Sequence, residues 1–329
     1  MERRRFMTGL AGLGAAVGLA SRAAIASSAE FKAWLDGVRS EAQRRGLSKR
    51  AIDVGLVDVA PIPRIIELDR RQPETTLTFS QYMERVVPLA RIEAGRAQLV
   101  DNRDLLARVS ARFNVQPQFI VALWAVETDY GRITGGFPVI AALATLAYDG
   151  RRSAFFREEL FNALKIVDRG HVDPREMRGS WAGAMGQNQF MPSSYLSYAI
   201  DFDGDGKADI WTSRADVFAS SANYLSRVGW RGDEGWGRVV RLPEGFDTAL
   251  IDHTKVQKPT AEWRTLGVAS IEGRALGEEF RSAGSLVQPG GADGPTYLVH
   301  ANYRALLRWN RSLYFATAVG YLADQIDQS

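Results

Sequence analysis

The stretch "LWAVETDYGR", residues 123–132, decides the fold, because it places a carboxylate, Glu127, on the apolar face of a helix. Pro117 fits a first helical turn and Gly131 lies just past a last one, so a helix is predicted between them. Residues three and four apart share a helix face. Four apolar residues form the face that leads to Glu127: Phe119, Ile120, Leu123 and Trp124. The carboxylate needs an explanation, because burying an unpaired charge is costly.

Two explanations of Glu127 are open from this helix alone. Desolvation raises the pKa of a carboxyl group, as a general acid working near neutral pH requires. Alternatively, the side chain turns toward solvent at a fraying last turn. A glycosidase normally uses two carboxylates, but Asp129 points to nearly the opposite side of the helix and is predicted to be a solvated charge. A lone Glu127 would act first as acid and then as base, with a nucleophile supplied by the substrate.

The composition is that of a globular protein, with 329 residues, 46% hydrophobic and 24% charged. The net charge of +3 does not indicate a nucleic-acid partner, because residues 1–26 hold four arginines and one glutamate, and the chain beyond them is neutral. The absence of cysteine excludes a lipidated anchor, a thiol nucleophile and a cysteine metal site. Three scattered histidines give little support for a zinc site.

The N-terminus, "MERRRFMTGLAGLGAAVGLASRAAIASS", has the features of an export signal. A basic start precedes a short, weakly apolar run and small residues, and cleavage is predicted after Ala26. Arg3 and Arg4, followed by Phe6, resemble a twin-arginine signal. The run is too short for a membrane span. We therefore expect a periplasmic protein that is neither a lipoprotein nor held by a transmembrane anchor.

The remaining pattern predicts a mainly α fold of the α+β class. Apolar periodicity predicts helices at 153–168, with Ser153 as its cap, at 214–228 and at 302–326. Short β-like runs separated by Gly and Pro occur between 238 and 300, including 248–253 and 263–271. The predicted division is an N-terminal helical lobe (27–105), a core (106–237), a small β-rich lobe (238–300) and a C-terminal helix that returns to the helical body (301–329).

Six blocks of sequence carry a resemblance to a known family. They are "PETTLTFSQYMERVV" (73–87), "VALWAVETDYGR" (121–132), "GSWAGAMGQNQFMPSSY" (179–195), "DFDGDGKADIW" (201–211), "SSANYL" (220–225) and "RWNRSLYFATAV" (308–319). In this order they resemble the lytic murein transglycosylase B family, glycoside hydrolase family 103. The resemblance implies a lysozyme-like helical core with an α lobe and a β lobe. It also implies cleavage of the MurNAc–GlcNAc β-1,4 bond of peptidoglycan, with Glu127 as single acid and base and a 1,6-anhydro product.

The resemblance also implies substrate-binding residues. Ser180 matches a serine that orients the acid, and Gln189 and Phe190 match a sugar-contacting block. The other implied contacts are Tyr82, Tyr224 and Asn310 along the cleft, and Arg151 and Arg152 near the peptide and lactyl groups. Each has a plain structural alternative: Phe190 as core, Ser180 as a helix cap, and the arginines as a solvated face.

Three positions depart from the family pattern. Trp309 stands where a tyrosine is familiar beside Asn310, so ring stacking is expected there, while the hydrogen bonding of the tyrosine is left open. Gln187 and Asn188 replace small or aromatic residues, and we expect them to alter the preference for sugars.

The acidic block has the spacing of an EF-hand loop. Position twelve is Thr212 instead of Glu, and Asp216 is the predicted substitute. The full predicted ligand set is Asp201, Asp203, Asp205, Lys207 through its carbonyl, Asp209 and Asp216. Ca2+ is favoured over Mg2+ because the ligands are hard, numerous and flexible, with Na+ as a further option and an acidic turn as the alternative. Its role would be structural, and no cofactor is expected for catalysis.

The resulting hypothesis is a monomeric enzyme whose partners are peptidoglycan glycan strands and complexes that build or remodel the cell wall. Two alternatives stay open. One is a hydrolytic muramidase that uses a remote carboxylate, such as Asp149, and a water molecule. The other is a non-catalytic peptidoglycan-binding protein.

Overall fold

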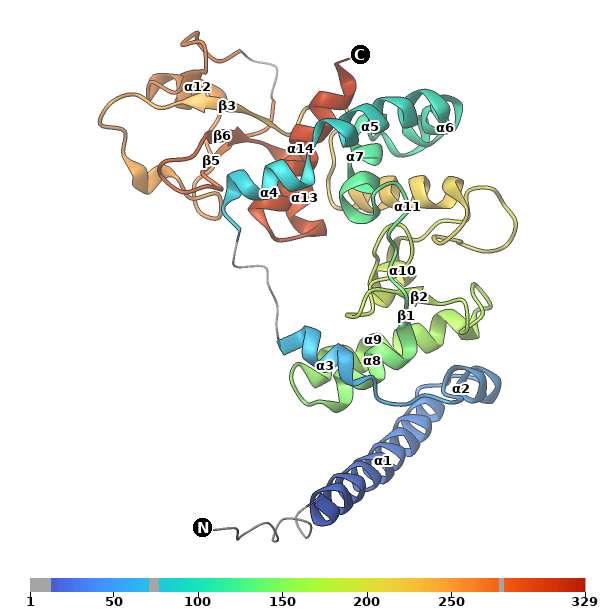
Figure 1. The fold of residues 1–329 in the computed structure, drawn as a ribbon. Helices are drawn as coiled ribbons and strands as arrows, with labels where there is room; N and C mark the ends of the chain where they lie inside the picture. The colour runs from blue at the N-terminus through green and yellow to red at the C-terminus, as the bar shows by residue number, and fades with distance from the viewer. Residues whose placement is uncertain (1–12, 71–76, 278–280, 329) are drawn as a thin grey trace, which may run out of the picture.

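The structure, a computed structural model, describes residues 13–70, 77–277 and 281–328, with side chains from residue 29 onward. It has a mainly helical fold with small antiparallel sheets, which confirms the predicted class. Two helical bodies are joined by a narrow neck, and a β-rich lobe lies beside one of them (Figure 1). In the orientation of Figure 1 we call them the upper body and the lower body.

The lower body collects helices from the first third and the middle of the chain. These are α1 (Leu13–Arg44), α2 (Lys49–Gly55), α3 (Pro63–Arg70), α8 (Val139–Tyr148), α9 (Ser153–Asp168) and α10 (Pro192–Tyr198). Helices α8 and α9 form its centre, because α1, α2, α3 and α10 all contact one of the two. The apolar residues of α8 are buried almost without interruption, with Leu143 and Leu146 at most 1% exposed. This burial explains why α8 lacks the polar stripe of a surface helix.

The upper body is built around α7 (Pro117–Thr128), which packs against α5, α6, α11 and α14. Its other helices are α4 (Phe79–Val86), α5 (Leu89–Asp101), α6 (Arg103–Phe113), α11 (Arg214–Arg227), α13 (Ala301–Trp309) and α14 (Leu313–Asp327). Each body has its own apolar core. Tyr224 and Trp309 pack against both cores, so these two side chains bridge the bodies.

The β-rich lobe is a four-stranded antiparallel sheet in the order β4-β3-β6-β5. Its elements are β3 (Gly237–Arg241), η1 (Thr248–Leu250), α12 (Thr260–Thr265), β4 (Ala269–Ser270), β5 (Ser285–Val287) and β6 (Thr296–Val299). Val239 pairs with Tyr297, and Leu286 pairs with Leu298. A separate small core forms around Trp263, which is fully buried. In the neck, β1 (Phe137–Pro138) pairs with β2 (Arg178–Gly179).

Several predicted elements need correction. The helix predicted at 302–326 is interrupted, because α13 ends at Trp309 and Ser312 begins α14 by accepting a hydrogen bond from the Phe315 amide. The β-like run 248–253 contains the 3-10 helix η1, and the run 263–271 begins inside α12. Helix α9 has its predicted bounds, but its N-cap is Arg152, with φ of 57°, and not Ser153.

The predicted division into domains stays a prediction. Packing groups the residues differently from chain order, because residues 27–105 contribute Val38 and Ile52 to the lower core and Phe79 and Ile92 to the upper core. Residues 1–12 of the predicted export signal lie outside the described residues, and residues 13–26 form the start of α1. Within the described part of the chain, no helix has the length and apolar character needed to cross a membrane.

Candidate active site

Glu127 lies in the last turn of α7, at the end of the helix that faces the neck. Pro117 begins α7 at its first position, as predicted, and Asp129 ends it in a left-handed conformation. Residues 119–125 are all buried, so the helix is fixed by the upper core. Glu127 itself keeps partial exposure. Glu127 is therefore held by a rigid element while part of the residue stays exposed.

The immediate partner of Glu127 is Trp309 at the end of α13. The Trp309 indole N–H donates a hydrogen bond of 2.6 Å to Oε1 of Glu127. Burial raises the pKa of Glu127 to about 7, and the hydrogen bond from Trp309 opposes this rise. No charged group among the described residues contributes to this pKa. The geometry thus gives a carboxyl group that exchanges its proton near neutral pH and has no second carboxylate beside it.

Trp309 is held by an aromatic cluster that spans the neck. Its ring lies 4.7 Å from that of Tyr224 and 5.2 Å from that of Phe190, and Tyr198 lies 4.4 Å from Tyr224. The Tyr224 hydroxyl also donates to the Arg308 carbonyl at 2.6 Å. Phe190 is buried, which agrees with the alternative that it is a core residue. Hydrogen bonding by Trp309 was left open by the sequence, and the structure places its indole N–H on Glu127. Stacking of its ring on a sugar stays a prediction.

The loop between β2 and α10 lies against the segment that follows α7. The Ser180 hydroxyl accepts a hydrogen bond from the Ala184 amide at 3.1 Å, which closes a tight turn. Gln189, with φ of 51°, donates its side-chain amide to the carbonyls of Thr134 and Gly186. Gly135 is required here, because a Cβ on it would lie 2.2 Å from the Gly179 carbonyl oxygen. Both predicted contacts therefore border the neck and also shape its backbone.

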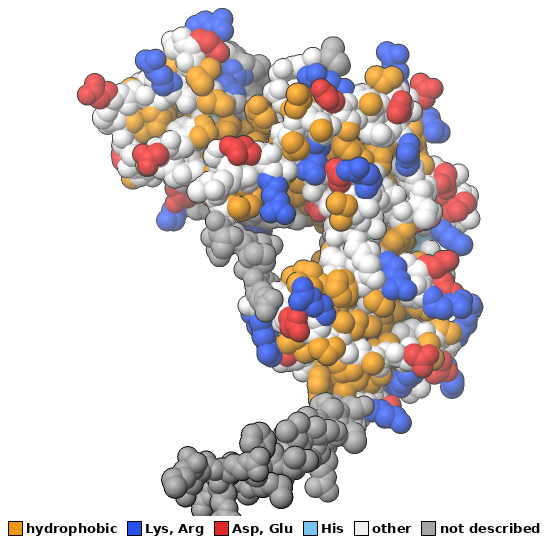
Figure 2. Space-filling model, viewed as in Figure 1, with side chains coloured by type: hydrophobic (Ala, Val, Ile, Leu, Met, Phe, Trp, Pro, Cys, Tyr) orange, Lys and Arg blue, Asp and Glu red, His pale blue; other side chains and the backbone are white. Residues whose placement is uncertain are grey.

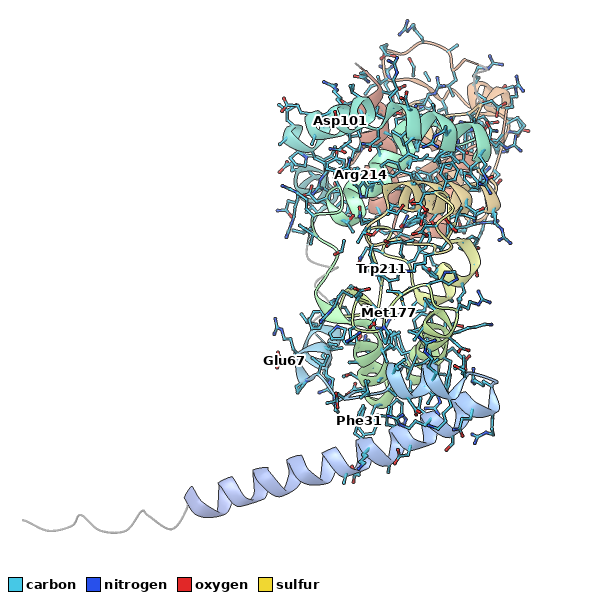
Figure 3. All side chains as sticks on the ribbon, turned by 90° about the vertical axis from the view of Figure 1, so that its right-hand side faces the viewer. Phe31, Glu67, Asp101, Met177, Trp211 and Arg214 are labelled. Atoms are coloured by element: carbon cyan, nitrogen blue, oxygen red, sulfur yellow. The ribbon has the colours of Figure 1, made fainter. Side chains whose placement is uncertain are left out.

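Gln187 and Asn188 hold neighbouring segments in place through hydrogen bonds within the protein. Their expected effect on the preference for sugars stays a prediction. Gln187 accepts from the Trp124 indole at 2.8 Å and donates to the Trp211 carbonyl at 2.7 Å. Asn188 is buried and donates to the Val217 carbonyl. Figure 3 shows Trp211 at the neck, between Met177 of the lower body and Arg214 of the upper body.

The remaining predicted contacts lie on several elements. Tyr82 of α4 has its ring 5.5 Å from that of Tyr314, at the contact between α4 and α14. Asn310 directly follows Trp309, is exposed, and accepts a hydrogen bond from the Ser312 amide. Asn310 is thus the predicted polar residue nearest in sequence to the Trp309–Glu127 pair.

Arg151 and Arg152 are paired with a carboxylate that sequence reasoning did not find. Asp69 of α3 is 1% exposed, and it lies 2.6 Å from the Arg152 guanidinium and 3.5 Å from that of Arg151. The two arginine side chains keep about half of their surface exposed, at 51% and 46%. The two arginines are therefore anchored by a buried carboxylate and keep the other part of their surface open to solvent.

The other candidate carboxylates are engaged away from Glu127. Asp149 ends α8 and pairs with Arg70 at 3.1 Å. Asp129 was predicted to be a solvated charge, but its side chain is only 13% exposed and is paired with Arg91 and Arg132. The prediction failed because the helix ends at Asp129, where the left-handed turn redirects its side chain.

The acidic loop brings together three of its predicted ligands. One carboxylate oxygen each from Asp201, Asp203 and Asp205 lies within 4.8 Å of the other two. Asp209 instead accepts hydrogen bonds from the Trp211 and Thr212 amides. The predicted substitute, Asp216, is fully buried and accepts the amides of Phe202 and Asp209, each at 2.7 Å. Lys207 is exposed, and its own amide donates to Asp205.

The molecule is hollowed at the neck, between the upper and lower bodies, with hydrophobic side chains gathered on the lower body beside the hollow (Figure 2). A different cavity of about 630 Å3 lies between α2 and the end of α9, and it includes none of the predicted site residues. Trp309 was predicted from the sequence only as a ring that stacks, and its hydrogen bond to Glu127 was missed. Its only sequence signal was its place beside Asn310 in the last family block.

Comparisons with known proteins agree with this geometry. Residues 30–324 match the family model described as the transglycosylase SLT domain. Membrane-bound lytic murein transglycosylase B of Escherichia coli strain K12 is 28% identical over 298 residues, which cover 86% of this chain and 79% of that protein. SltB3 from Pseudomonas aeruginosa, solved in complex with NAG-anhNAM-pentapeptide, has a TM-score of 0.88 at 43% identity, covering 91% of this chain and 80% of that one. Escherichia coli SLT35, solved in complex with calcium, has a TM-score of 0.74 at 26% identity, covering 91% and 93%.

Proposed function

The chain belongs to the family of the transglycosylase SLT domain, and on this premise we propose that it is a lytic murein transglycosylase in which Glu127 is the single acid and base. The bond that it cleaves is the β-1,4 bond between N-acetylmuramic acid and N-acetylglucosamine. The observation that supports this role is the environment of Glu127. Its pKa is raised to about 7 by burial, and no carboxylate among the residues that the structure describes contributes to it.

The proposed reaction needs only one protein carboxyl group. Protonated Glu127 donates its proton to the glycosidic oxygen, and the bond from that oxygen to C1 of the muramoyl residue breaks. The substrate's 2-acetamido group stabilises the positive charge at C1. Ionised Glu127 then takes the proton of the muramoyl C6 hydroxyl, and that oxygen bonds to C1 to give the 1,6-anhydro product. A glycosidase with two carboxylates would instead need a second one to act as nucleophile or to activate water.

The other predicted contacts are proposed to line the glycan path through the neck. Trp309 and Tyr224 would offer ring faces to sugars, and Ser180, Gln189 and Asn310 would offer polar groups. Phe190 would act indirectly, because its ring packs against that of Trp309. Tyr82 would contact the strand farther from the reacting bond. The half-exposed guanidinium groups of Arg151 and Arg152 suit the carboxylates of a peptide stem or lactyl group.

The acidic loop is proposed to hold a structural Ca2+ ion. Three carboxylates with oxygens within 4.8 Å form a hard, oxygen-only donor set of the kind that Ca2+ prefers. The ligands are proposed to be Asp201, Asp203 and Asp205, with the Lys207 carbonyl. Asp209 and Asp216 lie outside this group of three carboxylates, and the amides that they accept would organise the loop around the ion. The ion would neutralise repulsion among the carboxylates and take no part in the reaction.

We also propose that the protein is periplasmic and that peptidoglycan strands are its partner. The basic and weakly apolar start of the chain supports export. Association with complexes that build or remodel the wall, and action as a monomer, are part of the same proposal.

Mass spectrometry of the released muropeptides tests the proposed reaction. The wild-type protein should release anhydro products, which are lighter than hydrolytic products by one water molecule. Glu127→Gln should release none, because glutamine cannot donate and reclaim a proton. Products that carry the added water would favour a muramidase, and a Glu127→Gln variant that digests sacculi as fast as wild type would reject the mechanism.

A further inference from the structure

The backbone directly after the proposed acid is strained. Asp129, Tyr130 and Gly131 have consecutive positive φ angles of 52°, 60° and 81°. Glycine adopts this left-handed conformation freely, whereas a residue with a Cβ is disfavoured there by contact of the Cβ with the backbone. Two non-glycine residues in succession therefore require contacts that hold them.

Those contacts converge on Arg91, near the start of α5. Arg91 Nε donates to Oδ1 of Asp129 at 3.4 Å, and the Tyr130 hydroxyl donates to the Arg91 carbonyl at 2.5 Å. The Arg91 guanidinium also donates to the Val86 carbonyl at the end of α4. Arg91 and Asp129 are only 19% and 13% exposed, so solvent screens their interaction weakly. Arg132, the second partner of Asp129, is 76% exposed.

The strained turn is continuous with the helical turn that carries Glu127. The Asp129 amide donates to the Ala125 carbonyl at 2.9 Å, and the Tyr130 amide donates to the Trp124 carbonyl at 3.3 Å. These bonds enclose Glu127 and determine how the last turn of α7 closes. A change in the turn would therefore change the direction in which the Glu127 side chain leaves the helix.

We infer that Asp129 is a positioning residue, which acts through its ion pair with Arg91 to hold Glu127 against Trp309. This inference rests on the proposed function of Glu127. Asp129 supports the reaction by geometry and does not touch the reacting atoms. Burial raises the pKa of Asp129, but the hydrogen bond from Arg132 and the charge of Arg91 outweigh this effect and leave the pKa below its ordinary value. Asp129 is therefore ionised at neutral pH, as the ion pair requires.

Two substitutions separate the ion pair from the backbone strain. Asp129→Gly accepts the left-handed conformation without cost but loses the carboxylate, and Arg91→Met keeps the length and apolar stem of the side chain but loses the charge. Each should lower kcat about tenfold or more on soluble glycan fragments, with KM within about twofold, because small displacements of a catalytic group are costly. The double variant should lose no more than the more impaired single variant, because both remove one pair.

A second readout distinguishes positioning from general destabilisation. No charged group in the described part of the chain contributes to the pKa of Glu127, so loss of the Asp129 charge should have no direct effect on it. If Asp129→Asn loosens the bond from Trp309, the pKa of Glu127 rises. The fall of kcat/KM on the alkaline side of the pH profile, which we call the alkaline limb, then moves to higher pH. Asn tolerates the left-handed conformation, so this variant also serves if Asp129→Gly does not fold.

The matched control is Arg132→Ala, which removes the exposed partner of Asp129 and should leave kcat within about twofold. A folded Asp129→Gly variant with the kcat of wild type, or an Asp129→Asn variant with unchanged kcat and alkaline limb, would overturn the inference. These outcomes are distinct from failure of the proposed function, which would appear in the wild-type protein as products that carry the added water.

Discussion

The indole N–H of Trp309 donates to Oε1 of Glu127 at 2.6 Å and joins the ends of α13 and α7 across 182 residues of sequence. An indole nitrogen is only a donor, so Oε1 must act as the acceptor whether the carboxyl group is protonated or ionised. The carbonyl oxygen of a protonated carboxyl group is its better acceptor, so this contact favours the acid proton on the other oxygen, Oε2. A tyrosine at this position would offer both a donor and an acceptor and would not impose the same choice.

The pH dependence of activity should follow the raised pKa of Glu127. The first step requires the protonated form, so kcat/KM should be sustained below pH 7 and fall about tenfold per unit above it. An ordinary glutamate, with a pKa near 4.5, would place this fall more than two units lower. Initial rates on soluble glycan fragments measure the fall of kcat/KM with rising pH, and thermal unfolding over the same pH range shows that the fold persists. A limb near pH 5 would contradict the prediction.

Trp309→Phe should move that alkaline limb upward. The hydrogen bond from Trp309 stabilises ionised Glu127 and lowers its pKa, so its loss leaves the effect of burial unopposed. A hydrogen bond to a charged group is worth about 1.5 kcal/mol or more, which corresponds to about one pH unit. The pH profile of kcat/KM is the measurement.

The matched comparison for Trp309→Phe is Tyr224→Phe. This variant keeps the ring that packs on Trp309 but loses the hydroxyl that donates to the Arg308 carbonyl. Its alkaline limb should stay in place. Equal shifts in both variants would mean that packing, and not the indole N–H, controls the acid.

The sequence alone predicted the helix that carries Glu127, because its start, end and apolar face are all local signals. It also predicted α9 to its bounds and α11 to within one residue at its end. It missed the break at Asn310 to Ser312, because apolar periodicity continues through that segment and only the cap formed by Ser312 interrupts it.

The contacts of the site could not be predicted from local patterns. Trp309 and Glu127 meet because α13 and α7 share the upper core, and Asp69 meets Arg152 because α3 packs on α8. These pairings depend on how helices pack, and no spacing rule specifies a partner 182 residues away. Asp129 was misjudged for a related reason, since a regular helix was extended one residue too far.

Removal of Ca2+ should lower the melting temperature of the wild-type protein. An ion that binds only the folded chain stabilises it by about 2.7 kcal/mol at one hundred times its dissociation constant. That corresponds to a shift of several degrees for a chain of this size. Asp205→Asn should abolish the response, because it removes one of the three clustered carboxylates. Scanning calorimetry with chelator and with added Ca2+ measures the shift.

The control for the metal prediction is Asp293→Asn, which changes an exposed aspartate in a loop of the β-rich lobe. This variant should respond to Ca2+ as wild type does. A wild-type melting temperature that is the same in chelator and in Ca2+ would exclude a structural ion in the loop.

Gln187→Leu should destabilise the fold, because Gln187 links α7 to the segment before α11. The substitution leaves the Trp124 indole N–H and the Trp211 carbonyl without their partner, at 2.8 Å and 2.7 Å in the native protein. Each unsatisfied buried group costs about 1 kcal/mol or more, so we expect a loss of about 2 kcal/mol in the free energy of unfolding, measured in urea. Gln43→Leu, an exposed change on α1, should have little effect.

Gln187→Glu tests the hydrogen bonds of this side chain with Trp124 and Trp211 through the pH dependence of stability. Its protonated carboxyl group can accept from Trp124 and donate to Trp211, whereas the ionised form directs a negative charge at the Trp211 carbonyl oxygen. The folded state therefore favours the protonated form, so the pKa of this glutamate rises on folding. Relative to wild type, the variant should be most stable below the unfolded pKa of glutamate, near 4.3, and lose stability as the pH rises above it. A difference from wild type that does not change with pH would mean that the Gln187 amide makes no such bond in solution.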